Sequence, residues 1–444
     1  MKKLVALVLA AALGISTLLT GCGSSNNSTS QKSSSTKTSE SQTAKQVTLR
    51  FSWWGDDTRH QATLNAIKLF EQKYPNIKIK AEYAGWDGYL DKQTTQIAGG
   101  TAADIMQIGS NWLNIFSKDG NGFYDLNKLS NELKLKENFT NDILKLGTVN
   151  GKLNGIPVAM TGPVAYYNKT IYDKLGIPIP QTWDDLFNAA KKFPKGSYPV
   201  AFQSANMNVL IAYAEQMTGK TFIDDNGKLG FDENDIKTAL EFYKKLLDSK
   251  VTPSIQELTN EGGQNGSLEQ LPSFLQGKLA GLFQWTTGIQ KQAAPLKEKN
   301  MEVVCGGLPI PKDAKISGVI VKPSMLFAIN KDCKNPKEAA TFLNFLLNDP
   351  EGVKALGTSR GVPVSKSAED TLKKEGLISG LEYDGLQFLL NHPTVPYSPY
   401  IEDPKLQDLY KEVLTKISYN MFSPDEAAKY MYDNIQKILS EITK

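Results

Sequence analysis

The chain has 444 residues, of which 22% are charged and 9% are aromatic, and its formal net charge is +3. This length suits two or three domains. The near balance of charge excludes the basic stripe with which nucleic-acid-binding proteins neutralise phosphates. We therefore expect a globular protein with no nucleic-acid partner.

Residues 1–21 have the features of a secretory leader. Lys2 and Lys3 precede the apolar run 4–13, which is too short and wrongly flanked to span a membrane. The leader ends in LLTGC, which resembles the bacterial lipobox, whose cysteine is lipidated and becomes the new N-terminus. The sequence therefore predicts a lipid anchor on Cys22, at the outer face of the cell membrane; an ordinary signal peptide with a stray cysteine is the alternative.

Cys22 and the segment 23–46 form a predicted linker. Thirteen of the 24 residues from Gly23 to Gln46 are Ser or Thr, and such a segment has too little apolar surface to fold. The other two cysteines, Cys305 and Cys333, show no CxxC or zinc spacing. We predict two free thiols in different lobes, with a disulfide as the alternative.

The stretch from Leu49 to His60, LRFSWWGDDTRH, opens a predicted β-α-β unit. A strand of period two ends in Trp53 and Trp54, and a second strand covers 77–83. Between them, Asp56, Asp57 and Thr58 offer N-cap groups to a helix predicted over 59–73. Ligands of open α/β sheets bind beyond the carboxyl ends of the strands, so Trp53, Trp54 and Arg59 are candidate ligand residues. A place in the core is the alternative for both tryptophans, more so for Trp53, which continues the apolar face. His60 is predicted either to touch a ligand or to lie on the helix surface.

The next strand supplies a second set of candidates. A helix is predicted over 89–98, after the turn GWDG, and a buried strand over 103–108. Ser110, Asn111 and Trp112 follow the carboxyl end of that strand, where a ligand is expected. Asp104, at its start, is predicted to be structural and to tie loop amides.

Three segments are predicted to cross between two lobes. Two of them, 152–169 and 319–329, are extended apolar runs in which glycines and prolines exclude a helix, and the third, 357–365, has turn chemistry. They carry Tyr166, Lys322 and Arg360, respectively. The stretch 274–284 is predicted to contain a helix end, a glycine turn and a buried strand that delivers Trp285. An exposed place at a sheet edge is the alternative for Lys322. Further helices are predicted over 182–193, which starts with a Thr182/Asp185 variant of the capping box, and over 235–249, 336–347, 405–419 and 424–442.

The sequence gives little sign of catalytic or metal chemistry. It has two histidines, His60 and His392, and HExxH does not occur. The run MTGKT lacks the first glycine of a P-loop, since Ala214 stands there. The sequence does not decide whether two Asp or Glu side chains form the catalytic pair of a glycoside hydrolase, because the fold sets their separation. We predict no metal, no cofactor and no enzymatic activity.

Taken together, the lipobox, SWWG…RH, TAADIMQI, GKLNGIPV, YYNK and the late ALG…RGVP resemble the extracellular sugar-binding lipoproteins of bacterial ABC importers. These are the maltodextrin-binding-like members of solute-binding protein family 1, in particular the binders of oligogalacturonide and other pectic oligosaccharides. The resemblance implies an α/β, two-lobed, periplasmic-binding-protein-like (type II) fold with a hinge of crossing strands. It implies one lobe of 47–161 plus 325–358 and another of 162–324 plus 359–444.

The same resemblance implies a set of ligand-binding positions: Trp53, Trp54, Arg59, Ser110, Asn111, Trp112, Tyr166, Trp285, Lys322 and Arg360. It implies a monomer that captures an oligosaccharide and delivers it to the permease subunits of an ABC importer, which carry a cytoplasmic ATPase. A uronic-acid-containing ligand is expected, with a neutral plant oligosaccharide as the alternative, since the pectic binders carry an arginine where this chain has Pro163. A secreted, lipid-anchored glycoside hydrolase or lyase is the alternative function.

Overall fold

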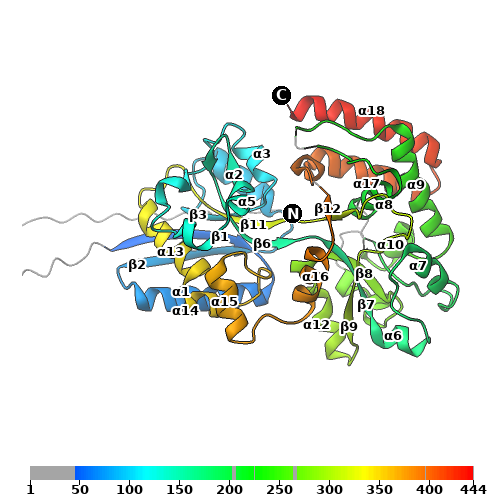
Figure 1. The fold of residues 1–444 in the computed structure, drawn as a ribbon, viewed down its shortest axis with the longest axis horizontal. Helices are drawn as coiled ribbons and strands as arrows, with labels where there is room; N and C mark the ends of the chain where they lie inside the picture. The colour runs from blue at the N-terminus through cyan, green and yellow to red at the C-terminus, as the bar shows by residue number, and fades with distance from the viewer. Residues whose placement is uncertain (1–45, 203–206, 225, 264–267, 396, 444) are drawn as a thin grey trace, which may run out of the picture. The chain divides into compact units, whose positions relative to one another are not determined.

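In the computed structural model, the described residues are 46–443 without 203–206, 225, 264–267 and 396. The predicted leader, Cys22 and the linker up to Lys45 lie outside the described residues. Two clusters of buried side chains organise the rest of the chain. The first lobe is built on the core around Phe51 and Phe327, on the left of Figure 1, and the second lobe on the core around Tyr167 and Phe283, on its right.

The first lobe holds a mixed five-stranded sheet in the order β2-β1-β3-β11-β6. Its strands are β1 (Val47–Trp54), β2 (Ile77–Ala84), β3 (Ile105–Ile108), β6 (Ile156–Thr161) and β11 (Lys322–Ile329). β1 runs parallel to β2 and β3, whereas β11 is antiparallel to β3 and β6. Leu49, Phe51 and Trp53 are fully buried on one face of β1, which confirms the predicted period of two.

Helices cover both faces of this sheet, with α2 and α3 on one side and α1 and α14 on the other (Figure 1). The bounds in this lobe are α1 (Asp57–Lys73), α2 (Tyr89–Ala98), α3 (Trp112–Phe116), α4 (Leu135–Asn138), α5 (Asn141–Lys145), α13 (Pro336–Asn348), α14 (Pro350–Leu356) and α15 (Lys366–Lys374), with a 3₁₀ helix (Leu126–Leu129) and the hairpin β4 (Thr148–Val149) and β5 (Lys152–Leu153). α1 begins two residues before the predicted start, because the Asp56 carboxylate caps it by accepting a hydrogen bond from the Arg59 amide at 2.9 Å.

The second lobe holds an antiparallel three-stranded sheet in the order β8-β7-β9. Its strands are β7 (Pro163–Asn168), β8 (Gly281–Trp285) and β9 (Val303–Gly307), and its helices are α6 (Lys169–Lys174), α7 (Trp183–Ala190), α8 (Asn208–Thr218), α9 (Glu233–Asp248), α10 (Ile255–Asn260), α11 (Pro272–Leu275), α12 (Gln290–Glu298), α16 (Leu381–Leu390), α17 (Pro404–Ser418) and α18 (Pro424–Ile442), with 3₁₀ helices Leu268–Gln270, Thr286–Gly288 and Pro399–Glu402. The predicted capping box of α7 is confirmed, because the Thr182 and Asp185 side chains each accept the other's backbone amide.

Two of the three predicted crossings pass between the lobes. The chain leaves the first sheet at the end of β6 and enters the second sheet in β7, with Gly162 between them. It returns through β10 (Val319–Ile320), which pairs with β12 (Thr394–Val395), into β11. The crossings touch at Gly162, where an added Cβ would lie 2.2 Å from the Ile320 carbonyl oxygen. No side chain fits at this position.

The third predicted crossing, 357–365, is wrong. α15 packs against α13 and α14, and its Ala368 and Leu372 form a small core with Val353. The chain therefore stays with the first lobe through α15 and reaches the second lobe with α16. The assignment of 359–374 to the second lobe is wrong for the same reason. Gly357 and Gly361 have positive φ angles of 53° and 98°, and the turns that they form reverse the chain instead of carrying it across.

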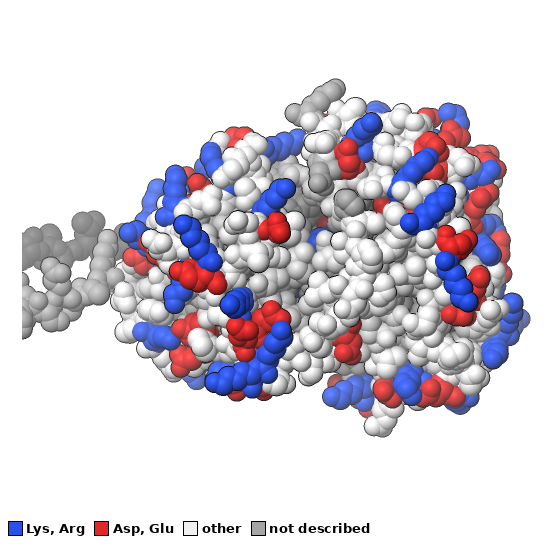
Figure 2. Space-filling view, in the orientation of Figure 1, with Lys and Arg blue, Asp and Glu red and all other residues white. Residues whose placement is uncertain are grey.

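Charged side chains of both signs are interspersed over the viewed face of the protein (Figure 2). On this face they crowd toward the outer sides of the two lobes, and the band between the lobes is mostly uncharged. This face therefore offers no continuous basic stripe. Within the part of the chain that the structure describes, no helix is long and apolar enough to cross a bilayer.

Candidate functional site

Trp53 belongs to the core of the first lobe. Its ring is fully buried and stacks on Phe51 and Tyr83, with centroids 4.9 and 5.0 Å away. Its indole N–H donates to His60 Nδ1 at 3.1 Å. The prediction that Trp53 faces a ligand is therefore wrong, since its packing and its polar atom are both satisfied inside the protein. His60 lies beneath the helix surface, where burial lowers the pKa of its imidazole.

Trp54 points to the opposite side of β1, into an aromatic cluster. We use this name for Trp54, Trp86, Tyr89 and Trp112. The ring of Trp54 lies 5.1 Å from Trp86 and 5.5 Å from both Tyr89 and Trp112. Trp86 is 57% exposed, whereas the other three rings are buried. The cluster therefore presents one large ring to solvent on a rigid aromatic base.

Two short loops bring the aromatic cluster together. Trp86 lies in the turn between β2 and α2, and Trp112 begins α3 just after β3. A Cβ on Gly109 would lie 2.9 Å from the Trp112 indole nitrogen, so glycine lets that ring fold back against the end of β3. Trp86 was not among the predicted site residues, because GWDG indicates a turn; a tryptophan between glycines in a polar turn was the available signal.

Arg59 and Arg360, which we call the arginine pair, lie beside the aromatic cluster. The Trp54 carbonyl accepts hydrogen bonds from Arg59 Nη1 at 3.3 Å and from the Gln107 amide at 3.1 Å. Gln107 in turn accepts from Arg360 Nε at 2.9 Å, and Arg59 Nε donates to the Ser359 carbonyl at 2.9 Å. One ring of hydrogen bonds thus joins the end of β1, the start of α1, β3 and the 357–365 turn.

The arginine pair is buried without a paired carboxylate. Arg59 is 9% exposed and Arg360 is 3% exposed, and the acceptors of their side chains are carbonyl, amide and hydroxyl oxygens. Among the described residues, no carboxylate forms an ion pair with either guanidinium, and Arg360 Nη1 has no hydrogen-bond partner. Burial lowers the pKa of Arg59 to about 10, partly offset by Asp56; burial and the neighbouring Arg59 lower the pKa of Arg360.

The third predicted cation, Lys322, is held in a different way. Its ammonium group forms an ion pair with the carboxylate of Glu402 and lies 4.5 Å from the centre of the Trp285 ring and 5.7 Å from that of Tyr397. We call Lys322, Trp285, Tyr397 and Glu402 the lysine box. The alternative of an exposed lysine at a sheet edge does not apply, because only 16% of this side chain is exposed.

The remaining predicted residues divide between the site and the core. Ser110 and Asn111 are half-buried, and the Asn111 amide donates to the Glu402 carbonyl at 3.4 Å, which joins the first lobe to the lysine box. Tyr166 is fully buried in the second lobe, and its hydroxyl donates to the Leu381 carbonyl at 3.2 Å. The prediction that Tyr166 faces a ligand is therefore wrong, for the same reason as Trp53.

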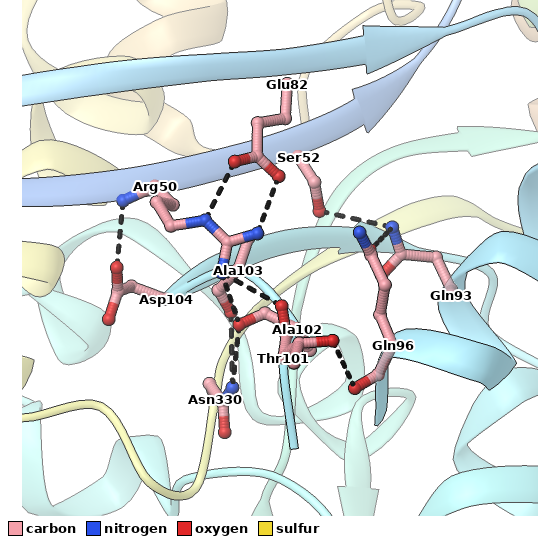
Figure 3. A network of polar contacts seen from close by, with 10 residues as sticks. All are labelled: Arg50, Ser52, Glu82, Gln93, Gln96, Thr101, Ala102, Ala103, Asp104 and Asn330. Carbon is pink, nitrogen blue, oxygen red and sulfur yellow. Dashed lines mark hydrogen bonds and ion pairs between the residues drawn. The ribbon is translucent and has the colours of Figure 1, made fainter. Parts of the chain in front are cut away.

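A polar network centred on Arg50 joins β1 and β2 to the loop before β3 (Figure 3). The Arg50 guanidinium binds both carboxylate oxygens of Glu82, at 2.7 and 2.9 Å, and its backbone amide donates to Asp104 at 2.8 Å. The same guanidinium donates to the Thr101 carbonyl at 2.9 Å. The structural role predicted for Asp104 is confirmed, since its carboxylate fixes a backbone amide of the neighbouring strand.

Cys305 and Cys333 are free, as predicted. Cys305 packs on the core of the second lobe and Cys333 on that of the first. Burial raises the pKa of each thiol to about 11, which disfavours the reactive thiolate. Within the described ranges, no group of three His, Cys, Asp or Glu side chains is placed to hold a metal ion.

The fold and the site define a two-lobed α/β protein in which aromatic rings and cations gather at the strand ends of one lobe and at the crossings. The sequence profile of the bacterial extracellular solute-binding proteins matches residues 55–353. The chain belongs to this family. The predicted family and two-lobed fold are therefore confirmed.

Individual relatives extend this result. The chain is 37% identical to an oligogalacturonide-binding protein of Yersinia enterocolitica solved with saturated digalacturonic acid, over 90% of this chain and all of the other, with a TM-score of 0.86. A second structure described as an oligogalacturonide-binding protein of that organism gives 36% identity, coverage of 89% and 100%, and a TM-score of 0.72. The diacetylchitobiose-binding protein of Streptomyces coelicolor is 26% identical over 84% of this chain and 85% of its own length.

Membership in this family decides whether the protein is an enzyme and on which side of the membrane it acts. The chain is a binding protein and not an enzyme, as predicted, so the glycosidase or lyase alternative is rejected. Its place is extracytoplasmic, as the leader predicts.

Proposed function

We propose that this protein captures an oligosaccharide outside the cytoplasmic membrane and delivers it to the permease subunits of an ABC importer. The observation that carries the proposal is the junction of the aromatic cluster with the arginine pair at the Trp54 carbonyl. A flat apolar ring with a polar edge suits the C–H face of a sugar, and guanidinium groups donate hydrogen bonds to sugar oxygens. The two kinds of group lie side by side on rigid elements.

The ligand that these groups favour contains uronic acid. Two buried guanidinium groups without a carboxylate partner carry a desolvation cost that an anionic ligand relieves. Arginine binds a carboxylate through two parallel hydrogen bonds, and Arg360 Nη1 is a buried donor without a described acceptor. The 37% identity to a protein solved with digalacturonic acid supports a pectic oligosaccharide.

A neutral oligosaccharide is the second candidate. The ion pair between Lys322 and Glu402 removes one positive charge from those available to a ligand. The relative from Streptomyces coelicolor, 26% identical, is named for diacetylchitobiose, which is a neutral sugar. Both facts favour a site in which hydrogen bonds, not charge, select the ligand.

Anchoring and delivery complete the proposal. Cys22 becomes the mature N-terminus and carries lipid; the two chains of a diacylglyceryl group are about what stable membrane anchoring requires. The protein acts as a monomer that docks on its permease. Cys22→Ala should release the folded protein into the medium or leave it uncleaved, and membrane fractionation checks this. An unchanged mature lipoprotein in the membrane fraction would contradict anchoring.

A thermal-shift screen of purified protein tests the ligand class. A ligand that binds only the native state at 100 times its Kd stabilises it by about 2.7 kcal/mol. Digalacturonate should raise the unfolding midpoint at lower concentration than diacetylchitobiose, or than the neutral digalactoside with the linkage of digalacturonate. A midpoint that no oligosaccharide moves would contradict the proposal, as would chromatographic evidence that the protein cleaves a bound sugar.

A further inference from the structure

Lys322 stands where the second crossing enters the first lobe. It opens β11 and pairs with Thr161 at the end of β6, so its backbone is fixed by the strands of the hinge. Its ammonium group lies over the faces of Trp285 and Tyr397, and these two rings are 6.3 Å apart at 73° to each other. The Tyr397 hydroxyl donates to Asn208 at 3.0 Å, which fixes that ring in turn.

Glu402 closes the remaining side of the lysine box. It ends the 3₁₀ helix Pro399–Glu402, and only 18% of its side chain is exposed. Its carboxylate pairs with Lys322, while its backbone carbonyl accepts the Asn111 amide from the first lobe. The carboxylate is thus carried by the second lobe and placed on a cation of the crossing, beside a residue of the first lobe.

The two groups of cations therefore differ in one respect that matters for ligand charge. The arginine pair has no carboxylate partner among the described residues, whereas Lys322 already has one. A second carboxylate that approached Lys322 would meet Glu402 within a few ångströms, and two carboxylates that share one site repel each other. An acidic ligand can use Lys322 only if Glu402 gives up its place.

We propose that Glu402 is a specificity-determining residue, an internal carboxylate that occupies Lys322 and competes there with the carboxylate of an acidic sugar. This inference rests on the proposed function. It confines the recognition of a uronic acid carboxylate to the arginine pair and leaves the lysine box to a neutral part of the ligand. The rings of Trp285 and Tyr397 hold the Lys322 side chain in place in both cases.

The test measures selectivity between two sugars of equal shape. Isothermal titration calorimetry at low salt compares digalacturonate with the neutral digalactoside of the same linkage, for the wild type and for Glu402→Gln. Glutamine keeps the size and a hydrogen-bond acceptor but removes the charge. We expect Glu402→Gln to bind digalacturonate about tenfold tighter than the wild type, which is close to the lower end of the coupling energies for close charge pairs at interfaces, and to leave the affinity for the digalactoside unchanged. Adding Lys322→Met should abolish the gain.

Glu82→Gln is the matched control. Glu82 is also a carboxylate in an ion pair, with 17% of its side chain exposed, but it pairs with Arg50 in the network of Figure 3. This variant should leave the selectivity between the two sugars unchanged. If Glu402→Gln does not fold, the double variant with Lys322→Met decides the question. It removes both charges of a pair that has no net charge, so it should leave the selectivity of the wild type unchanged.

Three results would overturn the inference. Glu402→Gln that changes the two affinities equally, or that weakens digalacturonate binding, assigns Glu402 a purely structural role. A loss of about tenfold or more in selectivity from the double variant, which lacks both charges of the pair, shows that the ligand carboxylate reaches Lys322 in the wild type. A wild type that binds neither sugar overturns both this inference and the proposed ligand class, whereas the first two results leave the proposed function intact.

Discussion

The arginine pair and the lysine box show two ways of keeping cations out of water. In the lysine box the protein supplies the counter-charge, because Glu402 pairs with Lys322 and two rings enclose the ammonium group. Arg59 and Arg360 are more deeply buried and have only uncharged acceptors for their side chains. The pair of Lys322 and Glu402 has no net charge, whereas the neighbouring guanidinium groups of the arginine pair repel each other.

The presence or absence of a protein counter-charge distinguishes cations that stabilise the fold from cations that are available to a ligand. A buried charge without a partner costs free energy in the unliganded protein. Selection for stability alone would therefore favour an apolar residue in place of each arginine. A binding site gains from the same arrangement, because a ligand carboxylate meets donors that are already desolvated and fixed in direction. We therefore assign ligand charge recognition to the arginine pair, and a supporting role to the lysine box.

The largest expected effect comes from Arg360→Met. This variant should weaken digalacturonate binding by about 2–5 kcal/mol, the cost of removing one partner of a buried charge pair. The free energy of unfolding without ligand should change by no more than about 1 kcal/mol, because lost hydrogen bonds are offset by the relief of desolvation. Calorimetry and urea titration measure the two quantities.

Arg50→Met provides the reference for Arg360→Met. Arg50 forms an ion pair outside the arginine pair, so its loss should affect stability and leave sugar affinity unchanged. An Arg360→Met variant that is strongly destabilised but keeps the ligand selectivity of the wild type would reverse our assignment, because Arg360 would then be a structural residue.

A smaller effect is expected from the exposed ring of the aromatic cluster. Trp86→Ala should weaken sugar binding by about 1–3 kcal/mol, the scale for an aromatic anchor at a binding hot spot, and should leave the unfolding midpoint nearly unchanged because the ring is 57% exposed. Trp53→Ala should affect stability and not sugar binding. It should lower the free energy of unfolding by about 3–5 kcal/mol, because it leaves a cavity in the core. Equal effects of the two variants on stability would contradict this division of the tryptophans.

Local patterns in the sequence were sufficient to predict most of the fold. The N-cap at Asp56 and the capping box at Thr182 depend on neighbouring residues, and both helices begin where these signals predict. The glycines at 357 and 361 also predicted a turn. They do not indicate which lobe the chain enters after the turn, because that depends on the packing of α15 against α14.

The site was harder to predict because its decisive contacts join distant parts of the chain. Trp53 and Trp54 are neighbours in sequence, yet the pleat of β1 sends one ring to the core and the other to the aromatic cluster. Glu402 lies 80 residues from Lys322, in a segment without a recognisable motif. No local signal reveals that this carboxylate neutralises the lysine.

The central claim is that the arginine pair lacks a protein counter-charge because the ligand supplies one. Calorimetry of the wild type with digalacturonate and with the neutral digalactoside, over a series of salt concentrations, tests it most directly. We predict that digalacturonate binds at least about tenfold tighter, a difference of about 1.4 kcal/mol, and that its affinity falls as salt screens the charges. Equal affinities for the two sugars, without any dependence on salt, would contradict the account.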